Sequence, residues 1–377
     1  ADLSPEGFAS ATGVSLIVGR RLAPPRILFA AIATVGSATR IDSRHADRLE
    51  AARSDKMRLH RTPRRFAAFA LLAGALVGCG SAGATQPTLA ADAGPAPPGC
   101  PTCTFGDVAV AGTVSAPAIA ELSGLAASRR HAGVLYTHND SGDGARFFAI
   151  GTDATSRGEF QVLGAKAVDW EDIAVAPCAV GTGAPNSCVY LADIGDNALV
   201  RSEVVVYRIP EPELAATAVT AVAFSFRYPD GPHNAETLLA DDKGELFVIT
   251  KEKAGPSVVF SLGIPSDTTS GTAVTATKVG TFVPPDDGSP LVTGGDFFPD
   301  AVCPRLVLRT YSDVLLFQAA APPAGQSALL TLLGAGYIKL PPLFEGQGEA
   351  VAFSTDGRAV YAAGEGVSVP LHRYLCE

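Results

Sequence analysis

The sequence predicts an all-β fold, and three observations support this. The chain of 377 residues is 47% hydrophobic and only 18% charged, which excludes a disordered protein. It contains 39 Gly and 28 Pro but a single Met and a single Trp, and this composition favours turns and short elements over long helices. Short runs of β-branched and aromatic residues recur from residue 121 onward. The most helical stretch, Pro210 to Ala216, predicts one or two turns.

A weak internal repeat from residue 121 to residue 377 indicates the architecture. In each unit an acidic residue precedes a short apolar strand, and further β-forming runs follow. Successive acidic residues are 50, 65, 60 and 53 positions apart. Four short strands in about 50 residues are typical of a β-propeller blade. We therefore predict a β-propeller of four-stranded blades, with five blades favoured and six as the alternative. The acidic residues are Glu121, Glu171, Glu236, Asp296 and Glu349.

The last unit lacks an obvious fourth strand, and the N-terminal run from Phe105 to Val114 can supply it. Such a strand would close the ring and remove the exposed sheet edges that favour aggregation. The first strand of each blade lines the axis, so we expect the five acidic residues to converge at one axial mouth.

The N-terminal part of the chain has a different character. Residues 1–78 carry 12 Lys+Arg against 6 Asp+Glu, whereas the remainder carries 17 against 32. After Met57, four arginines precede an apolar run of 13 residues, too short to span a bilayer. The run ends in Leu76-Val77-Gly78-Cys79, which resembles the lipobox of bacterial lipoproteins; a plain signal peptide is the alternative.

This resemblance implies a lipoprotein signal peptide over 57–78, a lipidated Cys79, and anchoring of the protein to a membrane of the bacterial cell envelope. Gly80-Ser81 lacks an acidic residue, which slightly favours the outer membrane. Residues 79–104 are rich in Ala, Gly and Pro and predict a flexible tether, followed by the propeller domain over 105–377. We interpret residues 1–56 as an over-extended start; a targeting extension is the alternative.

Seven cysteines divide into the lipidation site and six others. An even number in an exported chain predicts disulfides. Cys178 and Cys188 flank a Gly/Pro/Asn loop between two predicted strands, so we expect them to pair. The remaining four allow three pairings, which the sequence does not decide: Cys100, Cys103, Cys303 and Cys376.

Polar residues concentrate where the first two strands of each unit meet their loops, and they predict a binding site. Carboxylate oxygens gathered in a small space repel one another unless a cation balances them, and hard oxygen ligands suit Ca²⁺. Lys251 and Arg309 could instead neutralise the acids or hold an anionic ligand. Alternatively, the acids only accept hydrogen bonds from neighbouring blades. The candidate calcium ligands are Glu121, Asp140, Glu171, Asp193, Glu236, Asp296 and Glu349.

The motifs Glu121-Leu-Ser-Gly-Leu and Trp170-Glu171-Asp-Ile-Ala resemble those of exported propellers of the SdiA-regulated type and of phytase-like esterases. They are more distantly similar to gluconolactonase-like calcium propellers. The resemblance implies that a Glu on the inner strand binds a divalent cation. The matching positions are Glu121, Glu171, Glu236 and Glu349, with Asp296 as a conservative departure.

Three functions remain open from the sequence. The first is a lipid-anchored propeller that binds a small-molecule or protein ligand with Ca²⁺ at the axial mouth. The second is a calcium-dependent hydrolase of phosphoesters or lactones, for which the candidate catalytic residues are His138, Glu171, Lys251 and Arg309. The third is a protein-interaction scaffold without metal. The acidic propeller domain argues against nucleic acid as a partner, and we expect a monomer. The motifs of α/β-hydrolases, phosphate loops and zinc proteases are absent from the sequence.

Overall fold

The computed structural model of the chain describes residues 88–89, 100, 103–178, 187–266 and 271–377. The chain divides into two units, 1–80 and 81–377, and all described residues belong to the second. Cys79, the expected signal peptide and residues 1–56 therefore lie outside the described residues, as does most of the expected tether. No helix in the described ranges has both the length and the apolar character needed to cross a membrane.

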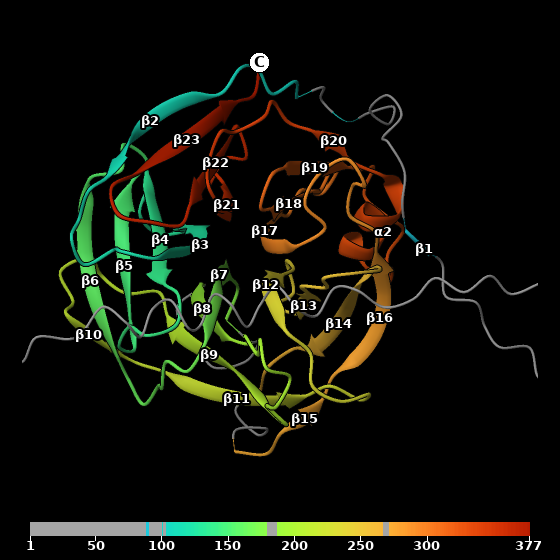
Figure 1. Ribbon diagram of the computed structural model, residues 1–377, viewed down its shortest axis with the longest axis horizontal. Helices are drawn as coiled ribbons and strands as arrows, with labels where there is room; N and C mark the ends of the chain where they lie inside the picture. The colour runs from blue at the N-terminus through green and yellow to red at the C-terminus, as the bar shows by residue number, and fades with distance from the viewer. Residues whose placement is uncertain (1–87, 90–99, 101–102, 179–186, 267–270) are drawn as a thin grey trace, which may run out of the picture. The chain divides into compact units, whose positions relative to one another are not determined.

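Five small antiparallel sheets surround a common axis, which confirms the prediction of a five-bladed β-propeller (Figure 1). The first strand of each sheet lies closest to the axis. These inner strands are β3 (Leu122–Ala127), β7 (Trp170–Ala176), β12 (Ala235–Ala240), β17 (Val292–Phe298) and β21 (Gly348–Phe353).

Within each blade the chain runs outward from the inner strand, and each strand pairs with the next. Three of the blades carry an additional short outer strand in parallel orientation. The remaining strands of blade 1 are β4 (Val134–Asn139), β5 (Arg146–Gly151), β6 (Ser156–Leu163) and β10 (Ala218–Thr220), and those of blade 2 are β8 (Cys188–Asp193), β9 (Val204–Pro210), β11 (Val222–Arg227) and β15 (Val274–Thr275). Blade 3 contains β13 (Leu246–Thr250), β14 (Ser257–Gly263), β16 (Thr277–Phe282) and β1 (Thr88–Leu89). Blade 4 contains β18 (Arg305–Thr310), β19 (Val314–Gln318) and β20 (Ile338–Lys339), and blade 5 contains β22 (Ala359–Gly364), β23 (Val369–Leu375) and β2 (Ala109–Val114).

The ring is closed by the N-terminal strand of the propeller domain, as the sequence predicts. β2 pairs antiparallel with β23, from Ala109 opposite Arg373 to Val114 opposite Val369. An isolated bridge between Phe105 and Cys376 extends this pairing. The fourth strand of blade 5 therefore comes from the opposite end of the domain, which leaves no unpaired edge on β23 at the point of closure.

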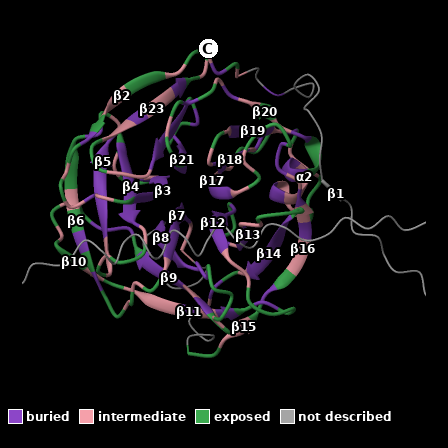
Figure 2. Ribbon diagram, viewed as in Figure 1, coloured by how far each residue is buried: buried purple, intermediate pink, exposed green. Residues whose placement is uncertain are grey.

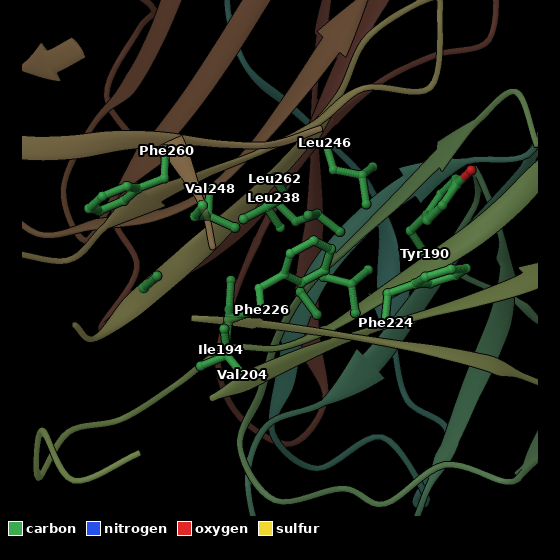
Figure 3. Packing of buried hydrophobic residues seen from close by; sticks show 14 of the residues in the cluster. Tyr190, Ile194, Val204, Phe224, Phe226, Leu238, Leu246, Val248, Phe260 and Leu262 are labelled. Atoms are coloured by element: carbon green, nitrogen blue, oxygen red, sulfur yellow. The ribbon is translucent and has the colours of Figure 1, made fainter. Parts of the chain in front are cut away.

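The hydrophobic core consists of five clusters, each of which fills the space between two neighbouring blades. The inner strands are buried, and exposed residues concentrate on the outer strands and loops (Figure 2). Figure 3 shows the contact of blades 2 and 3, where Phe224 and Phe226 face Leu238 and Val248. Because each blade presents two apolar faces, the blades stabilise one another around the ring.

Three disulfides join the cysteines among the described residues. Cys178 pairs with Cys188 across the hairpin between β7 and β8, as the sequence predicts. Cys100 pairs with Cys303 in the loop between β17 and β18. Cys103 pairs with Cys376 directly after β23. The structure thus settles the pairing that the sequence leaves open, and two of the three bridges attach the segment before β2 to blades 4 and 5.

The expectation of a helix at Pro210–Ala216 is wrong, because Pro210 ends β9 and the chain then forms a turn. The single helix in the described ranges is α2 (Ala328–Ala335), inserted between β19 and β20. Ser327 caps it by accepting a hydrogen bond from the Leu330 amide, and Gly336 ends it. Leu329, Leu332 and Leu333 are buried. This three- and four-residue spacing is the signal in the sequence that indicates the helix.

A buried glutamate joins blades 1 and 2 at the end of the axis where the inner strands end. Glu211 follows β9 and accepts hydrogen bonds from the hydroxyls of Ser128, Ser187 and Tyr136. The side chain of Arg130 donates to the Glu211 carbonyl oxygen at 2.8 Å. Because these donors come from both blades, the carboxylate links them through charge-assisted hydrogen bonds.

Candidate functional site

Each inner strand contains a β-bulge near its beginning, and the bulged residues mark equivalent positions in the five blades. The pairing skips one residue between strands one and two of every blade. A bulge re-aims the side chain of the extra residue. In three of the five blades this residue is a glutamate. The five bulged residues are Gly124, Glu171, Glu236, Thr293 and Glu349.

The bulges place the three glutamates at the first residues of their strands, where the inter-blade loops arrive. All three side chains are buried, with exposed fractions of 5% for Glu171, 3% for Glu236 and 8% for Glu349. We call this end of the axis the mouth. The structure therefore brings together three of the five acidic residues that the repeat predicts.

Glu236 forms an ion pair with Lys251. The Lys251 ammonium also donates a hydrogen bond of 2.7 Å to the Tyr311 hydroxyl and lies 4.5 Å from the centre of the same ring. Burial raises the pKa of Glu236 to about 7, although Lys251 opposes the shift. Burial opposes the charge of Lys251, but Glu236 and Tyr311 raise its pKa above the ordinary value. Lys251 is thus a fixed positive charge at the mouth.

Glu349 is another carboxyl group at the mouth whose pKa is raised. Burial, followed by the charge of Glu236, raises the pKa of Glu349 to about 8. The Gln347 amide donates to Glu349 at 3.4 Å and to Glu365 at 2.7 Å. Burial and the charges of Asp140 and Glu121 also raise the pKa of Glu365. Glu349 is consequently a protonated acid at neutral pH.

Three carboxyl groups from blades 1 and 2 form a compact cluster at the mouth. One oxygen each from Asp140, Asp169 and Glu171 lies within 4.8 Å of the other two. Burial and then the charges of Glu236 and Asp140 raise the pKa of Glu171 well above the ordinary value. Burial and then Asp140 also raise the pKa of Asp169. The surroundings of Asp169 and Glu171 therefore disfavour the negative charge of these two carboxyl groups.

The backbone of Gly195 lies directly against the carboxyl groups of Glu171 and Asp169 in this cluster. A Cβ atom on Gly195 would lie 2.0 Å from Glu171 Oε1 and 2.5 Å from Asp169 Oδ2. The Gly195 amide donates to the Asp169 carbonyl oxygen at 3.2 Å. Only a residue without a side chain allows both carboxylates to lie against this backbone.

Five of the seven candidate metal ligands are not members of this cluster. Glu236 and Glu349 lie elsewhere at the mouth, and Glu121, Asp193 and Asp296 lie apart from it. Asp193 is buried, forms an ion pair of 2.8 Å with Arg201, and accepts hydrogen bonds from the Val168 and Asp169 amides. It therefore holds the segment that carries Asp169. Glu121 is exposed, three residues before the bulge position of blade 1.

Asp296 follows the bulge of its strand by three residues and points away from the mouth. It accepts a hydrogen bond of 2.9 Å from the Phe353 amide and lines a cavity with Arg129 at the other end of the axis. Burial raises the pKa of Asp296 to about 7. The sequence motif thus aligns Asp296 with Glu171, Glu236 and Glu349. In the structure, however, Thr293 and not Asp296 occupies the bulge position that the glutamates occupy in their strands.

Two of the catalytic candidates lie behind the inner strands. His138 is fully buried, its ring lies 5.9 Å from that of Trp170, and burial lowers its pKa, so the ring is neutral. Arg309 is also buried and pairs with Glu345 at 2.5 Å. A Cβ on Gly348 would lie 1.9 Å from the Arg309 guanidinium, which explains the glycine before Glu349.

A cavity of about 410 Å³ lies at the side of the mouth. Its lining includes Leu199, His233 and Asn234 together with Lys251, which the mouth and the cavity share. The side-chain amide of Asn234 donates to Glu236 Oε1 at 3.4 Å, and Asn234 Oδ1 accepts from the backbone amide of Asp196 at 2.7 Å. A small molecule in this cavity would therefore reach the carboxyl groups through Lys251 and Asn234.

Reasoning from the sequence misses three residues of the site. Asp169, two residues before Glu171 in the chain, is not among the candidate ligands although it belongs to the cluster. Gln347 precedes the predicted inner strand by one residue, and its proximity to Glu349 in the chain was the available signal. Gly195 lies within Asp193-Ile-Gly-Asp196-Asn197, which loosely resembles a calcium loop. The role of this glycine depends on contacts with blade 2's inner strand, and the local sequence does not show them.

Comparisons with known proteins identify no family. No family model matches the chain, and no curated protein matches it. Among solved structures it is similar to the PQQ-bound aldose sugar dehydrogenase of Streptomyces coelicolor, with 14% identity and a TM-score of 0.43, covering 74% of this chain and 100% of that one. It is also similar to a gluconolactonase of Xanthomonas campestris (13%, 0.41, 76% and 99%) and to the allergen Mala s 1 of Malassezia sympodialis (12%, 0.44, 70% and 95%). At these values, the activity must be argued from the site.

Proposed function

We propose that this protein is a lipid-anchored propeller of the bacterial cell envelope that binds a small-molecule ligand together with Ca²⁺ at the mouth. The observation that carries the proposal is the cluster of Asp140, Asp169 and Glu171, whose oxygens lie within 4.8 Å of one another. Two oxygens bound to one Ca²⁺ at about 2.3–2.6 Å can be at most about 5 Å apart. The cluster therefore has the dimensions of a calcium site.

The charge balance of the mouth supports a cation of this kind. The carboxyl groups of Asp140, Asp169, Glu171 and Glu236 lie near two cations, the ammonium of Lys251 and the guanidinium of Arg201, and Arg201 already pairs with Asp193. Burial, followed by the charges of neighbouring carboxylates, raises the pKa values of Asp169, Glu171 and Glu349, and a divalent ion would favour their ionised forms. Carboxylates favour a hard cation over zinc or copper. The motifs that resemble those of the SdiA-regulated and phytase-like esterase propellers point to the same ion.

The cavity at the side of the mouth supports a small molecule as the ligand. Its volume of about 410 Å³ falls within the range of about 300–1,000 Å³ that is usual for such sites. Its lining offers amide, ammonium, imidazole and carboxyl groups beside Leu199 and Pro232. A protein partner would instead need a broad surface.

A hydrolase acting on phosphoesters or lactones is the second candidate, and Glu349 is the observation that favours it. When bound, Ca²⁺ would supply polarisation of a carbonyl or phosphoryl oxygen. With a pKa of about 8, Glu349 holds a proton at neutral pH and could donate it to a leaving oxygen. Lys251 and Tyr311, which hydrogen-bond to each other at 2.7 Å, would help to orient the substrate.

Thermal unfolding with and without calcium tests the proposal. Excess ligand at about 100 times its Kd stabilises a folded protein by about 2.7 kcal/mol, which raises Tm by about 5–10 °C in a domain of this size. We expect this shift in Ca²⁺ relative to EGTA and its loss in Glu171→Gln. Glu203→Gln, which alters an exposed ion pair with Arg227, is the matched control. An equal Tm in Ca²⁺ and EGTA would favour the interaction scaffold, and turnover of lactones or phosphomonoesters that requires Glu349 would favour the hydrolase.

A further inference from the structure

A second cavity lies at the end of the axis opposite the mouth, between blades 5 and 1. Its volume is about 690 Å³. The inner strands begin at the mouth, and the cavity is lined by the turns that follow their other ends, residues 128–133 after β3 and 354–358 after β21. It is therefore separate from the proposed calcium site.

The cavity is positively charged in an acidic domain. Three arginines and one aspartate line it, namely Arg129, Arg130, Arg358 and Asp356. By contrast, the chain after residue 78 carries 17 Lys+Arg against 32 Asp+Glu. A cluster of arginines on such a background indicates an anionic ligand, because guanidinium groups bind carboxylate and phosphate through paired hydrogen bonds.

Two of these arginines are available to a ligand. Arg130 is occupied, because it pairs with Glu213 and donates to the Glu211 carbonyl oxygen. Arg129 and Arg358 are exposed, and within the described ranges neither guanidinium makes a hydrogen bond or an ion pair, although the charges of Asp296 and Glu211 act on Arg129. The Asp356 carboxylate is already used, since it accepts hydrogen bonds from the Ser354 hydroxyl at 2.6 Å and the Arg358 amide at 3.0 Å.

The wall of the cavity beyond the arginines is apolar. Val134, Leu135, Ala359 and Tyr361 line it, and all four are buried in the core between the two blades or at its edge. The cavity also adjoins a smaller one of about 280 Å³ at the axis, which shares Arg129 with it and is lined by Val175, Phe353 and the carboxyl group of Asp296. The ligand must therefore combine a charged group with an apolar body.

We propose that this cavity binds a small amphipathic anion, whose carboxylate, phosphate or sulfonate group is held by Arg129 and Arg358 and whose apolar part packs against Leu135 and Tyr361. The size, the unpaired guanidinium groups and the apolar wall all favour this class of ligand. An inorganic anion would use only the arginines, and a neutral apolar molecule would leave them unpaired.

Fluorescence titration of the full chain with 8-anilinonaphthalene-1-sulfonate tests the proposal. N-phenyl-1-naphthylamine is the matched probe, because it has the same rings without the sulfonate. We expect the sulfonate to bind at one site at least about tenfold more tightly than the neutral probe, since charge-assisted hydrogen bonds separate them. Arg129→Gln and Arg358→Gln should each weaken sulfonate binding about tenfold and leave the neutral probe unaffected.

Two further arms make the test decisive. Arg227→Gln, which changes an exposed arginine on blade 2, should leave both affinities unchanged. Decanoate should displace the sulfonate probe, whereas inorganic phosphate at the same concentration should not. Equal affinity for the two probes, unchanged binding in both cavity variants, or equal displacement by phosphate and decanoate would overturn the proposal. Because the calcium cluster lies at the other end of the axis, EGTA should not affect these results.

Discussion

Gly195→Ala tests the geometry of the carboxyl cluster with the smallest available change. The new Cβ would lie 2.0 Å from Glu171 Oε1 and 2.5 Å from Asp169 Oδ2, whereas such contacts are essentially never shorter than 3.0 Å. Glu171 Oε1 must therefore retreat by about 1 Å, several times the tolerance of about 0.2 Å on a metal–ligand distance. The φ of Gly195 lies outside the left-handed region, so alanine adds no backbone strain.

In Gly195→Ala the proposed site should bind Ca²⁺ more weakly, while the fold is retained. Displacing groups that position metal ligands typically weakens binding by about 10–100-fold, and we expect a decrease in this range by isothermal titration with Ca²⁺. Gly346→Ala is the control, because its Cβ would meet nothing within 4 Å. Unchanged calcium affinity in Gly195→Ala, with a circular dichroism spectrum equal to that of the parent, would refute the assignment of Asp169 and Glu171 as ligands.

Three other predictions concern stability. Glu211→Gln places an amide where three hydroxyls donate, so we expect a loss of about 2–3 kcal/mol and a fall in Tm of about 5–10 °C. Replacing Cys103 and Cys376 together by Ser should cost about 2–5 kcal/mol in chemical denaturation, because the bridge constrains the unfolded chain across the ring closure. In EGTA, stability should fall as pH rises from about 5 to about 8, because folded Glu349 keeps its proton up to a pKa of about 8 instead of the ordinary 4.5. The slope is about 1.4 kcal/mol per pH unit for each proton by which the two states differ.

Glu213→Gln changes an exposed ion pair and should cost less than about 1 kcal/mol; an equal effect at Glu211 would contradict its role between the blades. A denaturation midpoint that survives loss of the Cys103–Cys376 bridge would mean that the pairing of β2 with β23 suffices for closure. Stability that rises over the same pH interval would show that Glu349 is ionised in the folded state.

The blade order and the ring closure could be predicted from the sequence because they depend on local strand patterns. The period of the acidic residues gave the blade count, and the run before Val114 was the one spare strand. The hairpin bridge from Cys178 to Cys188 was predictable for the same reason. The other two bridges were not, because they join segments more than 200 residues apart.

The candidate site was predictable only in part. Glu171, Glu236 and Glu349 share a bulge that the motif reflects, so the repeat aligns them correctly. Asp296 shares the motif but lies three residues beyond the bulge, and a strand pattern alone does not show where pairing skips a residue. The sequence also led us to expect Arg309 and His138 at the mouth. Both lie behind the inner strands instead, because their side chains face neighbouring blades rather than the axis.

The most direct test of a cation at the mouth is a crystal structure of the protein grown with Ca²⁺, with anomalous scattering used to locate the ion. We expect one peak at the mouth, within about 2.6 Å of an oxygen from each of Asp140, Asp169 and Glu171. A crystal in millimolar Ca²⁺ with no peak there, and with these carboxyl oxygens hydrogen-bonded to one another, would contradict this expectation.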